Sequence, residues 1–72
     1  MEREVALKLV NAGTMTNEEL LAFARQSGDL YVWEAAAKKL NLNGLSKDQL
    51  LKLRSKTYNQ CVCAVIDAAM KQ

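Results

Sequence analysis

The feature that most constrains this fold is a helix-start signal that recurs after 30 residues. Thr16–Glu19 and Ser46–Gln49 both have the capping-box pattern. In this pattern the hydroxyl accepts a hydrogen bond from the third helical amide, and the Glu or Gln side chain accepts one from the cap amide. Met15 and Leu45 precede the two boxes, each placed to form a hydrophobic staple with the leucine at the fourth helical position. These signals predict helix starts at residues 17 and 47.

The rest of the sequence follows the same 30-residue shift, which indicates an internal repeat. The aligned identities include Leu20 with Leu50, Leu21 with Leu51 and Val32 with Val62. Residues that favour helix caps also recur, at Ser27–Asp29 and Thr57–Asn59, and predict the second helix of each unit. Each unit is therefore expected to be a helical hairpin, the first over residues 16–42 and the second over 46–72.

Periodicity and composition favour helices throughout the chain. The last segment has apolar residues at helical spacing, namely Val62, Val65, Ile66, Ala69 and Met70. Glycines stand at the expected breaks, at Gly13, Gly28 and Gly44, and there is no proline. We expect one all-α domain over residues 1–72, with a lone helix and two hairpins. Its five helices are expected over residues 2–12, 17–27, 30–41, 47–56 and 60–71.

The first hairpin resembles a HEAT-type α-helical repeat. The resemblance lies in the Glu-Glu-Leu-Leu sequence of Glu18–Leu21 and in the second helix, Val32–Leu40; Ser46–Gln72 matches the pattern less closely. It implies a scaffold for protein contacts with no catalytic site. The chain lacks the proline that such units usually carry, so a compact five-helix bundle is the alternative to a stacked array.

The residue types argue against catalysis and cofactor binding. The chain has no histidine, no phosphate-binding glycine loop and no acidic calcium loop. Cys61 and Cys63 are two apart on the expected helix, which disfavours a bond between them, and no other Cys or His completes a zinc site. We expect buried or half-buried free thiols, with a redox or intermolecular disulfide role as the alternative. The sequence predicts no enzyme, no catalytic residue, no cofactor and no metal.

The ends and the hydropathy of the chain favour a cytoplasmic protein. The charged start Met1–Glu4 does not look like a signal peptide, and no apolar run approaches the roughly 20 residues that span a bilayer. Free thiols fit a reducing compartment. We therefore expect no membrane contact.

Charge is distributed unevenly along the chain. Residues 1–37 have three basic and six acidic groups, a net charge of −3, whereas residues 38–72 have seven basic and two acidic groups, a net charge of +5. The basic residues of the second hairpin, among them Lys52, Arg54 and Lys56, suit phosphates or an acidic protein. Many basic residues also fall late in their helices, where cations are favourable for the helix dipole.

Trp33, Tyr31 and Arg54 are the most informative candidates for a contact surface. Arg54 falls within the apolar stripe of its helix, where it either snorkels at the hairpin edge or contacts an acidic partner. Trp33 lies at the margin of its stripe beside Tyr31, so it either packs between helices or binds, and such residues are enriched at binding hot spots. We expect a non-enzymatic protein-interaction module, an adaptor or small inhibitor that binds a protein or itself. The partner-binding residues would be Trp33, Tyr31, Arg54, Lys52 and Lys56. The alternative is a nucleic-acid-binding domain that uses the basic hairpin.

Overall fold

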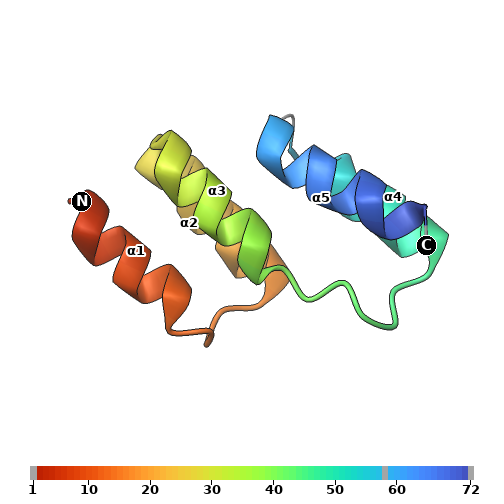
Figure 1. The fold of residues 1–72 in the computed structure, drawn as a ribbon, viewed down its shortest axis with the longest axis horizontal. Helices are drawn as coiled ribbons and strands as arrows, with labels where there is room; N and C mark the ends of the chain where they lie inside the picture. Colours follow the sequence, from red (N-terminus) through yellow and green to blue (C-terminus); the bar gives the residue numbers. More distant parts are fainter. Residues whose placement is uncertain (1, 58, 72) are drawn as a thin grey trace. The chain divides into compact units, whose positions relative to one another are not determined.

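The computed structural model describes residues 2–57 and 59–71, and over these residues the fold is all-helical, as predicted (Figure 1). Five helices and no strands occur in this part of the chain. The helices are α1 (Arg3–Asn11), α2 (Asn17–Ser27), α3 (Leu30–Lys39), α4 (Lys47–Arg54) and α5 (Gln60–Met70).

Both predicted capping boxes are present. The Thr16 hydroxyl accepts a hydrogen bond from the Glu19 amide at 3.2 Å, and the Thr16 amide donates to the Glu19 carboxylate at 2.9 Å. Ser46 and Gln49 make the same two bonds at 3.2 and 2.8 Å. These bonds satisfy amides that have no partner within the helix, so each box fixes the first turn of its helix.

The turns inside the two hairpins also use matching hydrogen bonds 30 residues apart. Asp29 caps α3 by accepting from the Tyr31 amide at 2.8 Å, and Asn59 caps α5 by accepting from the Cys61 amide at 2.9 Å. In the first turn Gly28 has a φ of 62° and ends α2 in the left-handed conformation. Only glycine adopts that conformation at little cost, so α2 ends where the sequence predicted.

Four of the helices end earlier than predicted, α5 by a single residue at Met70 rather than at residue 71. α3 stops at Lys39 rather than at residue 41, because Leu40 has extended backbone with a ψ of 132°. α4 stops at Arg54 rather than at residue 56, and α1 at Asn11 rather than at residue 12. Gly44 does have a positive φ, but it lies in the following loop and does not cap α3. Helix ends carry weaker sequence signals than helix starts, because no side chain is required there.

The chain divides into two compact units, one ending at Asn41 and the other beginning at Leu42. This boundary falls one residue before the end of the first predicted hairpin, residues 16–42. The prediction of one domain over residues 1–72 stays a prediction. In the first unit α1 and α2 both pack on α3. Its core consists of small and medium side chains, namely Ala6, Val10, Leu20, Ala24, Val32 and Ala36, with Phe23, Met15 and Leu7 around it.

The second unit is the α4–α5 hairpin. Its buried apolar side chains are Leu50 and Leu53 from α4 and Val62 and Ile66 from α5. Of the stripe predicted for α5, Val65, Ala69 and Met70 are half-buried. So few buried side chains make a thin core, as expected for a unit of this size.

Candidate functional site

Arg3 joins the first helix to the turn before α3. Its Nε donates to Asp29 Oδ2 at 2.8 Å, while Asp29 Oδ1 accepts the capping hydrogen bond from Tyr31. The Arg3 guanidinium also lies over the Tyr31 ring, 4.3 Å from its centroid, a cation–π distance. One aspartate therefore caps α3 and holds the arginine that covers the aromatic ring.

Electrostatics at this contact favour the charged forms of both partners. The hydrogen bond from Arg3 has the largest effect and lowers the pKa of Asp29 below its ordinary value. Desolvation, the second effect, raises this pKa, and the capping bond from the Tyr31 amide lowers it by a smaller amount. The hydrogen bond between Arg3 and Asp29 also raises the pKa of Arg3. Asp29 is therefore ionised in the folded protein at neutral pH.

Tyr31 and its neighbour Leu30 are exposed despite their size. Leu30 is 68% exposed and Tyr31 is 59% exposed, the two highest values among the large apolar side chains described. Arg3 contacts the Tyr31 ring from one side and so restricts the positions that the ring can take. An ordered aromatic side chain loses less conformational entropy on binding than a mobile one.

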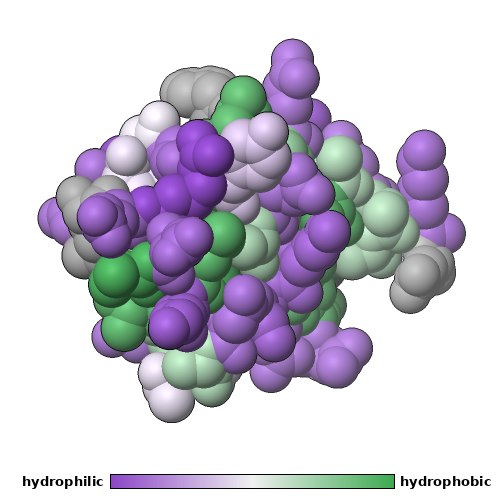
Figure 2. All heavy atoms as spheres, turned by 60° about the vertical axis from the view of Figure 1, so that its left-hand side comes forward, coloured by the Kyte–Doolittle hydropathy of each residue, from purple (hydrophilic) through white to green (hydrophobic). Residues whose placement is uncertain are grey.

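An open groove of about 500 Å³ runs beside Tyr31 between α1 and α3. Its lining is mixed: Leu7 and Asn11 from α1, and Tyr31, Glu34, Ala35, Lys38 and Lys39 from α3. Lys38 makes an exposed ion pair with Glu34 at 3.3 Å. Figure 2 turns the α1 side toward the viewer and shows hydrophobic side chains in patches among hydrophilic ones.

Trp33 lies on a different part of α3 from Tyr31. It is half-buried and packs against the core of the first unit, and it does not line the groove. Two residues along a helix differ by about 200°, so Tyr31 and Trp33 point in different directions. The two aromatic residues that the sequence grouped as one candidate surface are therefore separated by the helix geometry.

In the second unit, Arg54 pairs with Asp67 of α5. Arg54 Nε lies 3.1 Å from Asp67 Oδ1, and Arg54 Nη2 donates to Oδ2 at 3.5 Å. The sequence predicted that Arg54 either snorkels at the hairpin edge or contacts an acidic partner, and neither alternative foresaw that the chain itself supplies the carboxylate. The 30-residue shift contained the signal, because it aligns Arg54 with Ala24 and Asp67 with Ala37, two buried alanines of the first hairpin.

Lys52 and Lys56 are exposed in the second unit. Leu51, which precedes Lys52 on α4, is 45% exposed. A small depression here is lined by Leu51, Arg54, Ser55, Thr57 and Cys63. Cys61 and Cys63 are free and half-buried, as predicted, and the Cys63 thiol lies 3.8 Å from the Thr57 carbonyl oxygen. This hairpin thus combines exposed lysines with one exposed leucine, Leu51.

The sequence missed three residues of the Tyr31 surface, namely Arg3, Asp29 and Leu30. Asp29 was recognisable as a helix cap, but its second bond to Arg3 joins residues 26 apart in sequence. No local pattern reports such a contact. The exposure of Leu30 likewise follows from the way α3 packs and not from its residue type.

Residues 2–57 and 59–71 contain no group of three or more Cys, Asp or Glu side chains placed to hold a metal ion. No helix in the described part of the chain is long and apolar enough to cross a membrane. Comparison with protein-family models, with curated proteins and with solved structures found no significant match. The HEAT-type resemblance and the cytoplasmic location therefore stay predictions.

Proposed function

We propose that this chain is a non-enzymatic protein-interaction module that binds its partner through Tyr31 and Leu30. The observation that carries the proposal is the Arg3–Tyr31 contact: an exposed aromatic ring held in place by an arginine that is itself fixed by Asp29. Tyrosine and arginine are enriched among the residues that dominate binding energies. An exposed leucine beside them adds apolar area that a partner can bury.

The experiment is a binding comparison of four proteins with the partner isolated from source cells. Tyr31→Ala is expected to weaken binding more than about tenfold, a typical hot-spot loss. Tyr31→Phe retains the ring under Arg3 and is expected to bind nearly as well as the parent. Leu51→Ala is the matched control, since it removes an apolar side chain of similar exposure from the second unit. Equal binding by Tyr31→Ala and the parent would refute the assignment.

A photo-crosslinking residue at Leu30 tests the same surface without removing a contact. We expect it to crosslink to the partner, whereas the same photo-crosslinking residue placed at position 51 instead of Leu51 is expected to give no crosslink. Circular dichroism of each variant establishes that helix content is unchanged. The loss of binding is then attributable to the surface and not to unfolding.

Nucleic-acid binding is the second candidate, favoured by the charge of the second unit. Residues 42–72 have five basic and two acidic residues, and one of those acids, Asp67, is paired with Arg54. Phosphate binding through this unit predicts steeply salt-dependent affinity, weakened in Lys52→Glu and Lys56→Glu. Capture that survives nuclease and is unchanged in both lysine variants favours the protein partner instead.

A further inference from the structure

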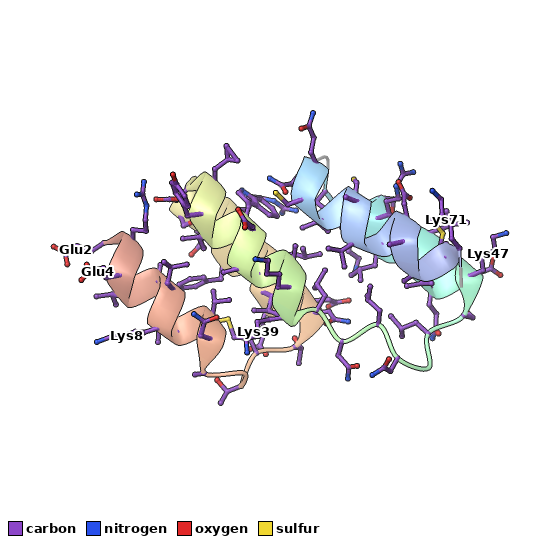
Figure 3. The ribbon with its side chains drawn as sticks, in the orientation of Figure 1. Glu2, Glu4, Lys8, Lys39, Lys47 and Lys71 are labelled. Atoms are coloured by element: carbon purple, nitrogen blue, oxygen red, sulfur yellow. The ribbon has the colours of Figure 1, made fainter. Side chains whose placement is uncertain are left out.

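The outer face of α1 carries two exposed apolar side chains one helical turn apart. Val5 is 46% exposed and Leu9 is 41% exposed, while Ala6 and Val10 on the inner face are buried in the core. In Figure 3 the labelled side chains of Glu2, Glu4 and Lys8 all project from α1 away from α3. The Val5–Leu9 stripe is therefore bordered by charged residues of both signs.

Glu4 and Lys8 are also one turn apart and lie along the same edge of this stripe. The spacing suits an ion pair within the helix, yet among the described residues neither side chain forms a salt bridge. Each charge is available to a neighbouring molecule. A surface with an acid toward one end and a base toward the other is complementary to its own inverted copy.

We propose that α1 is the contact through which two copies of this chain associate, with the two α1 helices antiparallel. A two-fold axis perpendicular to the two helices places Val5 of each copy against Leu9 of the other. The same axis brings Glu4 of each copy near Lys8 of the other. Antiparallel helices also oppose their dipoles favourably. In a parallel two-fold pair the edge that holds Glu4 and Lys8 faces the opposite edge of the partner helix, so these attractive pairs form only in the antiparallel arrangement.

The occupant is a second copy, because the pattern of one acidic and one basic residue beside the Val5–Leu9 stripe is complementary to itself. It is not complementary to a surface of uniform charge. A uniformly acidic surface would repel Glu2 and Glu4, and a uniformly basic one would repel Lys8. α1 has nine residues and is about 14 Å long, so the contact buries less area than a permanent dimer needs. The association is therefore weak and concentration-dependent.

Sedimentation equilibrium of the full chain over a wide concentration range tests the proposal. The parent is expected to shift from monomer toward dimer as concentration rises. Lys8→Glu and Glu4→Lys each replace two attractive pairs per dimer by two repulsive ones, so each is expected to weaken dimerisation about tenfold. Lys71→Glu makes the same change in net charge as Lys8→Glu, on an exposed lysine of the second unit, and is expected to dimerise like the parent.

Charge exchange separates a specific contact from a general effect of charge. An equimolar mixture of Lys8→Glu and Glu4→Lys is expected to form mixed dimers, because every cross-pair is again attractive. The double variant that carries both substitutions is expected to regain the parent's association. A parent chain that stays monomeric at every concentration overturns the proposal, and so does dimerisation that Lys8→Glu leaves unchanged. Helix content of each variant, measured by circular dichroism, excludes unfolding as the cause.

Discussion

The side-chain amide of Asn17 makes two hydrogen bonds to the backbone of Asn41. Its Nδ2 donates to the Asn41 carbonyl oxygen at 2.9 Å, and its Oδ1 accepts from the Asn41 amide at 2.8 Å. Asn17 is the first residue of α2, and Asn41 follows the end of α3. One side chain thus joins the open end of the first hairpin and satisfies backbone groups just beyond the point where α3 stops.

Asn17→Ala is expected to destabilise the protein by about 1–2 kcal/mol, because it removes two hydrogen bonds and leaves the backbone of Asn41 to water. Urea unfolding followed by circular dichroism measures the change. Gln26→Ala, on the exposed side of the same helix, is the control and is expected to change the stability by less than about 0.5 kcal/mol. Equal stability of the two variants would show that the contact contributes nothing.

The two capping boxes are expected to stabilise different units. Thr16→Ala and Ser46→Ala each remove a cap and are expected to cost about 1 kcal/mol. Amide hydrogen exchange is expected to rise mainly in α2 and α3 for Thr16→Ala and mainly in α4 and α5 for Ser46→Ala. Thr14→Ala, at an exposed position outside the helices, is the control. Identical exchange patterns in the two cap variants would show that the units open together.

The Asp29–Arg3 contact makes stability depend on acid pH. The pKa of Asp29 is lowered in the folded state, so the ionised carboxylate contributes to the free energy of unfolding. This contribution is complete at pH values above the ordinary pKa of 3.8 and is lost as the pH falls through the lowered pKa of the folded state. Asp29→Asn keeps an oxygen for the Tyr31 amide but removes the charge. The stability difference between the parent and Asp29→Asn is therefore expected to be largest near neutral pH and to shrink in acid.

Unfolding curves of the parent and Asp29→Asn between pH 7 and 2 provide this measurement, and groups common to both proteins cancel in the difference. An NMR titration of Arg3→Gln adds a direct check, since the pKa of Asp29 is expected to rise when its hydrogen-bond donor is changed. A stability difference that stays constant down to pH 2 is the contrary result.

The Arg54–Asp67 pair is expected to contribute little stability, because both side chains are about two-fifths exposed. A double-mutant cycle with Arg54→Ala and Asp67→Ala is expected to give a coupling energy of about 0.2–1 kcal/mol that decreases in salt. The double alanine variant reproduces the residues of the first hairpin at the aligned positions. A coupling energy well above this range would mean that water screens the pair less than its exposure implies.

Local chemistry accounts for the elements that the sequence predicted well. Thr16 and Ser46 fix helix starts because the cap and its partner lie three residues apart, so the bonds form whatever the rest of the chain does. Leu40 shows the limit of this local information. Nothing in its neighbourhood required α3 to stop at Lys39, and the contact between Asn17 and Asn41 is made across 24 residues.

The sequence by itself therefore determined the helices and most of the buried faces, because capping and amphipathic periodicity act within one or two turns. Only the tertiary structure decided which side chains meet: Arg3 with Asp29 and Tyr31, and Arg54 with Asp67. It also separated Trp33, packed against the core, from Tyr31, which is exposed. The physical reason is that such contacts depend on how each helix is rotated about its axis when it packs, and that rotation is set by the fit of all the core side chains together.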